Sequence, residues 1–270
     1  ALRFAAEDAA TLNALGERRG RQDLYRRQTP EILEGLRTMA VVESSESSNR
    51  IEGVVAPSFR VEALVLHNST PWNRSEQEIA GYRDALNLIH ESHADMAFSV
   101  NVVLQLHSML YRYHPAEGGR WKGEANEIVE RDGEGRLHRV RFTPPGPVET
   151  PELARGMVDG YERAVQAGRE PAILVPLAIL DFLCIHPFRD GNGRMARLLS
   201  LMLLYRHGYD VGRYISLERI VEDSKETYYE TLEASSLGWR DGRHDALPWM
   251  SYFWGTVLRA YDEFEERVGT

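Results

Sequence analysis

Apolar residues recur at helical spacing along most of the chain. In the segment 75–92, Ser75 and Glu78 form a candidate capping box. One face of that segment carries four apolar side chains, Ile79, Tyr82, Leu86 and Ile89. Comparable spacing predicts helices over 31–45, 99–114, 151–166, 171–186, 192–208, 224–236 and 245–268. The first of these fades into a polar end, and the last is amphipathic and rich in aromatic residues. The pattern therefore predicts a mostly α fold.

One segment departs from the helical pattern. Two short runs flank Asp132 and Gly133, which is a strong hairpin signal, and Pro144 and Pro145 then end the segment. No internal repeat and no low-complexity linker divides the chain. We therefore expect a mostly α core over residues 58–270 with one β-hairpin at about 126–143. Residues 1–57 are expected to form an N-terminal helical arm.

The composition of the chain limits the partners and the location that we expect for it. The chain of 270 residues has a formal net charge of -9, which argues against nonspecific binding to nucleic acid or to an acidic membrane through bulk charge. Cys184 is the only cysteine, so no disulfide forms within the chain. The first residues lack the pattern of a signal peptide, and the longest apolar stretch is too short to span a bilayer and contains Asp181. We expect a cytoplasmic protein with no membrane or nucleic-acid partner.

The most informative stretch is HPFRDGNGRMAR, residues 186–197, which follows the apolar segment 171–185 directly. Gly191 and Gly193 permit a sharp turn, and a new helix is expected to start near Asn192. The first N–H groups of a helix lack intrahelical partners and favour anions, above all phosphates. The turn is therefore a candidate phosphate cradle, fixed to the core by the apolar helix and by an inward-turning Phe188.

Charged residues complete this candidate site. Arg194 and Arg197 lie three positions apart, so both are expected on one side of the first helical turn, where they can clamp phosphate oxygens. Asp190 beside such a cradle implies a cation such as Mg2+. His186 is placed to accept a proton from an attacking hydroxyl. Each residue alone also fits a plain turn with a capping acid and surface arginines; the combination at this spacing favours the site.

The stretch 186–197 resembles the signature loop of the Fic (filamentation induced by cAMP) family, His-Pro-Phe-x-Asp/Glu-Gly-Asn-Gly-Arg-x-x-Arg, at every defined position. The resemblance extends over about 44–253 through the order of helices, the hairpin and the FTPP that follows it. It implies a Fic-type helical core that transfers AMP from ATP to a Ser, Thr or Tyr hydroxyl of a target protein.

The resemblance also implies a role for each residue of the loop. His186 would be the general base, and Asp190 would hold the Mg2+ that bridges the α- and β-phosphates. The phosphates would rest in a cradle formed by the backbone of Gly191 and Gly193 together with the side chain of Asn192. Arg194 would bind near the β-phosphate and Arg197 would bind the γ-phosphate.

A second motif, SNRIEG at 48–53, is similar to the inhibitory motif of the same family, Ser/Thr-x-x-x-Glu-Gly/Asn. By resemblance, this stretch with Ser48 would form an inhibitory helix whose Glu52 pairs with Arg197 and turns ATP away from its productive pose. The alternative is an ordinary helix end, with Gly53 as the residue after the cap and Glu52 as a solvated acid.

The hairpin and one later helix resemble two further parts of the family's site. The hairpin resembles a flap that docks the target by strand addition, and its target-facing strand is placed at Glu127, Ile128, Val129 and Glu130. The alternative is a purely structural hairpin. Tyr228 and Tyr229 fall in the region that borders the adenine, although both also fit simple packing of a helix on the core.

The sequence thus predicts an autoinhibited protein adenylyltransferase, with ATP and a target protein as partners and with self-modification included. Two alternatives stay open. The first is an enzyme that removes AMP, with Glu52 positioning a water. The second is a nucleotide-sensing regulator with vestigial catalysis. The sequence also leaves open a homodimer, the identity of the target and the signal that relieves inhibition.

Overall fold

The computed structural model describes residues 3–28, 30–131 and 136–268. The described chain is mostly α-helical, with one two-stranded antiparallel sheet, which confirms the predicted fold class. Its helices are α1 (Ala6–Gln28), α2 (Pro30–Ile51), α3 (Ser58–His67), α4 (Arg74–Ser92), α5 (Val100–Leu110), α6 (Thr150–Gln166), α7 (Pro171–Ile185), α8 (Asn192–Arg206), α9 (Leu217–Asp223), α10 (Lys225–Ser236) and α11 (Leu247–Val268). Its strands are β1 (Ile128–Arg131) and β2 (Leu137–Phe142). None of the described helices combines the length and the hydropathy that crossing a membrane requires.

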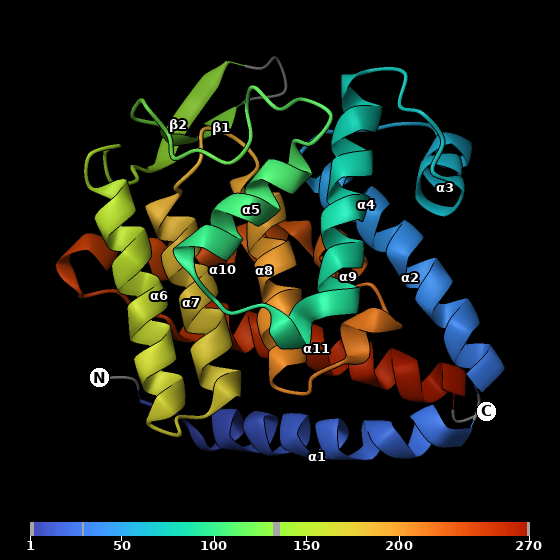
Figure 1. Cartoon of the computed structure of the whole chain (residues 1–270). Helices are drawn as coiled ribbons and strands as arrows, with labels where there is room; N and C mark the ends of the chain where they lie inside the picture. The colour runs from blue at the N-terminus through green and yellow to red at the C-terminus, as the bar shows by residue number, and fades with distance from the viewer. Residues whose placement is uncertain (1–2, 29, 132–135, 269–270) are drawn as a thin grey trace.

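Helices α7 and α8 pack against each other in the middle of the molecule (Figure 1). Helix α8 is buried along nearly its whole length, and Leu198, Leu199 and Met202 have no exposed surface. Arg194 and Arg197, near the start of the helix, are buried as well, so each needs a polar partner within the fold. The loop 186–191 joins these two helices, so the candidate site lies directly on the buried core.

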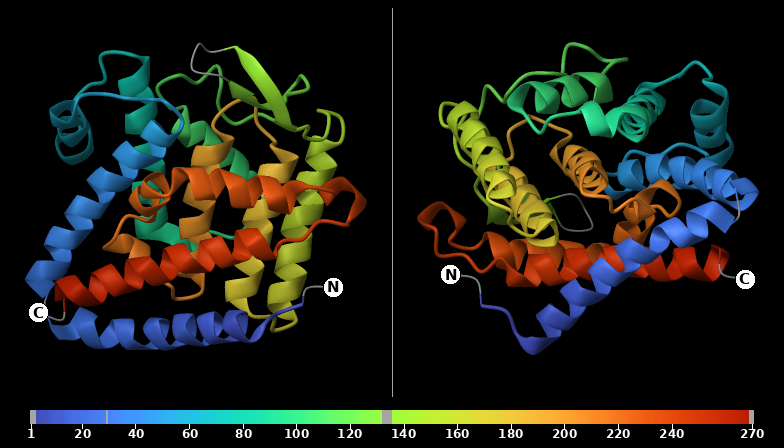
Figure 2. Two further views of the ribbon diagram at one scale, coloured as in Figure 1. Left: turned by 180° about the vertical axis from the view of Figure 1, so that it is seen from behind. Right: turned by 60° about the horizontal axis from the view of Figure 1, so that its bottom comes forward.

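The N-terminal helices pack closely on this body. Helix α1 runs beside α11, and α2 crosses the back of the molecule against α4 and α9 (Figure 2). Leu15 of α1 and Leu36 and Ile51 of α2 belong to the same hydrophobic core as α7 and α8. The two helices of the predicted arm therefore share the core of the molecule, and the domain boundary at residue 57 stays a prediction.

Two local predictions were wrong. Helix α4 is capped by Asn73, whose side chain accepts a hydrogen bond from the N–H of Glu76 at 3.0 Å, and not by a box of Ser75 and Glu78. Helix α2 does not fade after residue 45 but continues to Ile51, and most side chains of its polar end are buried. Polar residues can stay helical and buried where they find partners. The Ser44 hydroxyl, for example, donates to Glu218 Oε2 at 2.7 Å.

The hairpin forms at the predicted place. Ile128 of β1 pairs with Phe142 of β2, and Val129 pairs with Val140. The predicted turn at 132–133 lies outside the described residues. Arg139 of β2 binds both carboxylate oxygens of Glu233 on α10, at 2.6 and 2.9 Å, which ties the hairpin to the helix below it.

Helices α4 and α5 approach each other closely at Gly81. A Cβ at this position would overlap the backbone carbonyl of Leu110. Only glycine allows this separation, because no side chain stands between the two backbones.

Candidate active site

His186 is the residue at which α7 ends. Its backbone adopts the left-handed conformation, with φ 48°, and its N–H donates to the carbonyl of Phe182 at 2.9 Å. The ring Nδ1 lies 3.3 Å from the carbonyl oxygen of Leu183, which only accepts. Nδ1 therefore carries the proton, and Nε2 keeps a free lone pair. Burial lowers the pKa of His186 to about 4, so the imidazole is neutral at pH 7, which is the form a general base requires.

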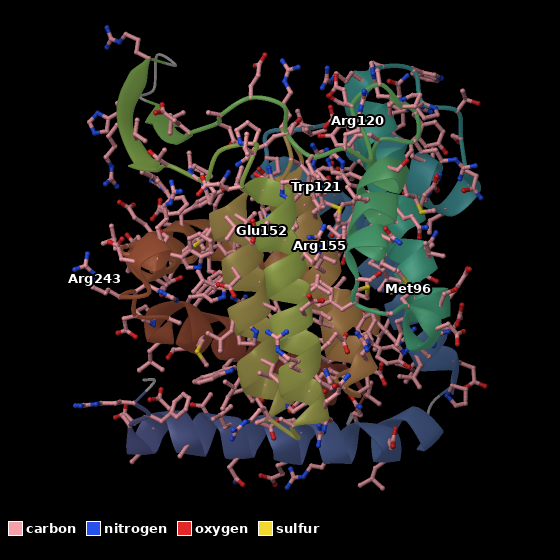
Figure 3. All side chains as sticks on the ribbon, turned by 60° about the vertical axis from the view of Figure 1, so that its left-hand side comes forward. Met96, Arg120, Trp121, Glu152, Arg155 and Arg243 are labelled. Atoms are coloured by element: carbon pink, nitrogen blue, oxygen red, sulfur yellow. The ribbon has the colours of Figure 1, made fainter. Side chains whose placement is uncertain are left out.

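Phe188 fixes the loop to the core, as expected. Its ring is fully buried and stacks on His107, with ring centroids 3.6 Å apart. Trp121, beside α6 in Figure 3, stacks on it at 5.3 Å. Asn192 also holds the backbone of Phe188, because its Oδ1 accepts from the N–H at 2.9 Å and its Nδ2 donates to the carbonyl at 2.8 Å. In this structure the buried side chain of Asn192 thus binds the loop itself, and the phosphate contact expected of it stays a prediction.

His107 holds the far end of the same loop. The N–H of Gly119 donates to His107 Nδ1 at 3.0 Å, so the ring proton is on Nε2, which donates to the carbonyl of Asp190 at 3.0 Å. Burial lowers the pKa of His107 to about 4 and keeps this neutral form. Sequence reasoning missed His107, and a lone histidine among the apolar residues of α5 was its only signal.

Helix α8 begins at Asn192, where the sequence predicted it. Gly191 precedes it with φ 81°, and a Cβ there would crowd the hydroxyl of Tyr111. The next glycine, Gly193, faces Glu52, because a Cβ on Gly193 would overlap Oε1 of that carboxylate. The start of α8 is therefore open to an anionic group, and in this structure the nearest one is a carboxylate of the chain itself.

A cavity of about 570 Å³ lies between the hairpin, α10 and the start of α8. It brings together many predicted residues that are far apart in the sequence: Glu52, Glu127, Ile128, Val129, His186, Gly193, Tyr228 and Tyr229. Their assigned roles stay predictions. Glu130 lies on β1, but its side chain is outside the described part of the structure.

Arg197 is anchored to the end of α2. Its Nε donates to Ser48 Oγ and its Nη2 to the Ser48 carbonyl, both at 2.8 Å, and Nη2 also donates to Glu52 Oε1 at 2.7 Å. The last contact is the one that the resemblance implied; its inhibitory role stays a prediction. Nη1 is buried without a hydrogen-bond partner among the described residues, and it lies 3.3 Å from the Cβ position of Gly193. An anion at the start of α8 would satisfy this nitrogen.

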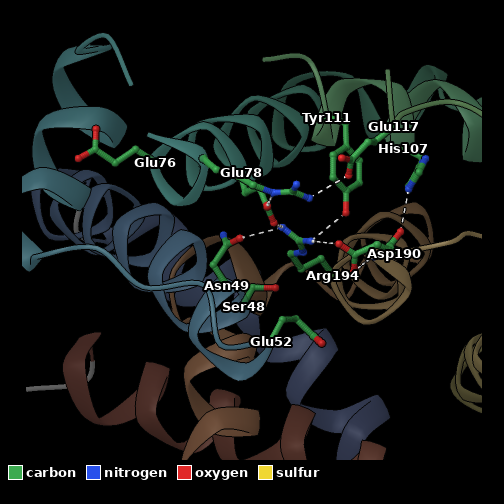
Figure 4. Close-up of polar contacts among 12 residues, drawn as sticks. Ser48, Asn49, Glu52, Glu76, Glu78, His107, Tyr111, Glu117, Asp190 and Arg194 are labelled. Atoms are coloured by element: carbon green, nitrogen blue, oxygen red, sulfur yellow. Dashed lines mark hydrogen bonds and ion pairs between the residues drawn. The ribbon is translucent and has the colours of Figure 1, made fainter. Parts of the chain in front are cut away.

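Arg194 has different surroundings (Figure 4). Its guanidinium is 1% exposed and donates to Glu78 Oε2 at 2.5 Å, to the Tyr111 hydroxyl at 3.0 Å and to Asn49 Oδ1 at 3.3 Å. The two arginines therefore engage separate partners instead of forming the expected clamp in this structure. A phosphate contact for Arg194 stays a prediction.

Asp190 is the candidate metal ligand. Its side chain is 59% exposed, and Oδ1 accepts from the N–H of Gly191 at 2.7 Å. Burial would raise the pKa of this carboxyl, but the charge of Arg194 and the Gly191 N–H overcome burial and lower it. Within the described ranges, no group of three or more His, Cys, Asp or Glu residues is arranged to hold a metal ion. Mg2+ usually takes only one or two protein carboxylates together with phosphates and water, so a single Asp190 fits it when ATP supplies the other ligands.

Two lysines at the site were also missed. Lys225 Nζ donates to the carbonyl of Ile51 at 2.8 Å and so binds the end of α2, and Lys122 Nζ donates to the carbonyl of Ile185 at 3.1 Å. Both contacts join residues more than 60 positions apart. No sequence spacing indicates such pairs.

Comparison with known proteins agrees with this geometry. Residues 97–204 match the model of the Fic/DOC family. Protein adenylyltransferase fic-1 of Caenorhabditis elegans is 25% identical over 185 residues, which cover 66% of this chain and 32% of that protein. Protein adenylyltransferase Fic of Drosophila willistoni is 30% identical over 134 residues, covering 49% of this chain and 25% of that protein. The chain thus spans about a third or less of the length of these two curated relatives.

A solved structure shows the same fold over almost the whole chain. A Fic family protein from Desulfovibrio desulfuricans superposes with a TM-score of 0.80 and 23% identity, over 98% of this chain and 76% of that one. The match of residues 97–204 to the Fic/DOC model agrees with the resemblance carried by the loop 186–197, and this segment of the chain is a Fic/DOC domain.

Proposed function

We propose that this chain is an autoinhibited protein adenylyltransferase that transfers AMP from ATP to a Ser, Thr or Tyr hydroxyl of a protein, including its own. The observation that carries the proposal is the arrangement at the start of α8. A neutral His186 lines the same cavity as Gly193, and Glu52 lies between that cavity and Arg197. The names of the curated relatives support AMP transfer as the reaction.

The chain's own groups suit this reaction. His186 Nε2 takes the proton of the target hydroxyl while that oxygen attacks the α-phosphorus. The new oxygen–phosphorus bond forms as the bond from the α-phosphorus to the bridging oxygen breaks, and pyrophosphate leaves. The start of α8 and the unpartnered Nη1 of Arg197 supply donors for the phosphate oxygens. Mg2+ held by Asp190 would supply further neutralisation of phosphate charge.

Glu52 inhibits by occupying the place of a phosphate. Its carboxylate accepts a hydrogen bond from Arg197 Nη2 at 2.7 Å and fills the space beside Gly193. A terminal phosphate of ATP would therefore meet both a negative charge and a steric block at this position. Ser48 and Lys225 hold the end of α2 in this position through Arg197 Nε and the Ile51 carbonyl. Release of inhibition therefore requires Glu52 to leave Arg197.

The hairpin offers a place for the target. In the described structure β1 pairs with β2 alone, so its other edge carries unpaired backbone groups. Glu127, Ile128 and Val129 line the cavity that also contains His186. An extended target segment added to β1 would bring its hydroxyl towards this histidine.

The experiment incubates the Glu52→Gly variant with Mg2+ and with ATP that is labelled on the α-phosphate. It measures how much label is transferred to protein. We expect labelled protein, including the variant itself, at a much higher level than with the wild type. ATP labelled on the γ-phosphate is the matched control and should leave protein unlabelled. Label must disappear in Glu52→Gly/His186→Ala. ATP binding without transfer in every variant would favour the nucleotide-sensing regulator instead.

Removal of AMP is the second candidate, because Glu52 and His186 line the same cavity and a carboxylate there is placed to orient a water. Water would attack the phosphorus, releasing AMP and restoring the hydroxyl. Protein labelled by Glu52→Gly serves as the substrate for wild-type protein. Under this alternative the wild type removes the label and Glu52→Gly does not.

A further inference from the structure

The backbone on both sides of His186 is held by the segment that leads into β1. Lys122 Nζ donates to the carbonyl of Ile185 at 3.1 Å, and the Lys122 N–H donates to the carbonyl of Pro187 at 2.9 Å. Asn126, four positions after Lys122, donates from Nδ2 to the carbonyl of Phe188, the residue after Pro187, at 3.1 Å. Three loop carbonyls around the candidate base are thus bound by two residues.

The position of Lys122 is not explained by an ion pair. The side chain is 4% exposed, and Nζ binds the neutral oxygens of Ile185 and, at 2.9 Å, Asn126 Oδ1. No ion pair joins Lys122 to a carboxylate within the described ranges. Burial lowers the pKa of Lys122 to about 8, so it keeps its charge at neutral pH. A buried ammonium is costly, which points to a specific task for this residue.

That task follows from the backbone of His186. His186 has a left-handed backbone, which is strained for a residue other than glycine, so surrounding contacts must hold it. Lys122 binds the carbonyls immediately before and after this residue. These bonds fix the direction in which the ring leaves the chain.

The same segment is attached to the hairpin. Asn126 stands two positions before Ile128, the first residue of β1. Trp121, which precedes Lys122, is stacked on Phe188. A displacement of β1 therefore acts on the loop through the side chains of Lys122 and Asn126.

We propose that Lys122 and Asn126 form a brace that positions His186 and couples it to the strand on which a target docks. The inference rests on the proposed function and adds two positioning residues to it. The brace acts through the loop carbonyls, and neither residue touches the reacting atoms.

The experiment measures AMP transfer in the Glu52→Gly protein as parent. Lys122→Met should lower kcat about 100-fold, the loss expected when a catalytic group is displaced by about 1 Å, with little change in KM for ATP. Lys122→Arg keeps a charged donor and should recover much of kcat. Asn126→Asp keeps the acceptor for Lys122 but loses the donor to Phe188, so it should also lower kcat.

Arg120→Met is the matched control, because Arg120 is exposed (Figure 3) and its guanidinium binds the carbonyl of Ala116.

The pH profile separates positioning from general damage. Burial and the charge of Lys122 lower the pKa of His186, whereas Glu52 and Asp190 raise it. In the Glu52→Gly parent, Lys122→Met should therefore move the acid limb of kcat to higher pH. Lys122→Arg and Arg120→Met should leave the limb in place. Thermal unfolding of each variant confirms that it is folded.

Two failures are distinguishable. A Glu52→Gly parent that transfers no AMP overturns the proposed function, and the brace with it. A parent that transfers AMP, combined with a folded Lys122→Met variant of unchanged kcat and unchanged acid limb, overturns the brace alone.

Discussion

Arg194 and Arg197 stand three positions apart on α8, and both are buried, yet their surroundings differ. Arg194 faces α4 and α5 and pairs with Glu78, whose side chain is 7% exposed. Arg197 faces the end of α2 and pairs with Glu52, whose side chain is 29% exposed and lines the cavity. One pair is enclosed by the fold, and the other is open to solvent on the acid's side.

This difference separates a structural pair from a releasable one. Removing a carboxylate from an enclosed pair strands a buried charge, which costs much more than the pair contributes. Removing a carboxylate at the edge of a cavity leaves an arginine that water or a ligand can reach. The pair at Arg194 is therefore part of the core, and the pair at Arg197 is the one on which the proposed inhibition depends.

The largest expected effect on stability comes from Glu78→Ala. It leaves the buried Arg194 with only the more distant carboxylate of Asp190, at 3.7 Å, so we expect the free energy of unfolding to fall by roughly 3 kcal/mol or more. Denaturant unfolding at pH 7 measures it. The matched control, Glu117→Ala, removes a more exposed acid that pairs with Arg74 and should cost under about 0.5 kcal/mol. Equal losses for Glu78→Ala and Glu52→Ala would erase the distinction between the two pairs.

A smaller effect is expected on acidification, through His107 on the Arg194 side. The folded protein binds a proton at His107 only near pH 4, whereas the unfolded chain binds one near pH 6.5. Stability should therefore fall as pH drops from about 6.5 to 4, by roughly 3 kcal/mol from this residue. His186 and other buried histidines add to the total, so the measurement is the difference between wild type and His107→Gln. The variant should show a shallower slope of unfolding free energy against pH, and an identical slope would contradict the assignment.

The smallest expected effect concerns the contact between Glu52 and the start of α8. Gly193→Ala places a methyl group against Glu52 Oε1 and should weaken the contact with Arg197. In a Glu52→Gly background the same change removes a helical glycine without this clash and should stabilise by up to about 1 kcal/mol. The double-mutant cycle is expected to give a coupling of about 1–2 kcal/mol between the two positions. Additive effects would show that Glu52 does not rest against the start of α8.

Much of the core and of the loop could be predicted, because local rules govern them. The turn between α7 and α8 followed from two glycines, the start of α8 from helix geometry and the burial of Phe188 from its apolar ring. The hairpin followed from two strand-like runs around a turn signal. The contact between Glu52 and Arg197 came from the family resemblance, since nothing in the spacing of residues 52 and 197 indicates it.

The remaining parts depend on tertiary contacts. The sequence predicts a capping box of Ser75 and Glu78 at the start of α4, but Asn73 caps this helix and Glu78 pairs with Arg194. The polar end of α2 looked solvated because serine and asparagine usually are. Asn49 is fully buried because its side chain binds the backbone of its own helix and Arg194. Such partners are set by how helices meet in space.

Gly81 shows how far from the reacting groups such control extends. This glycine sets the distance between α4 and α5, and those helices deliver Glu78 and, just past the end of α5, Tyr111 to the same guanidinium. Any larger residue would wedge the helices apart and pull these two groups away from Arg194. The alignment of the loop between α7 and α8 therefore depends on the width of a side chain at a helix crossing that does not line the cavity around His186.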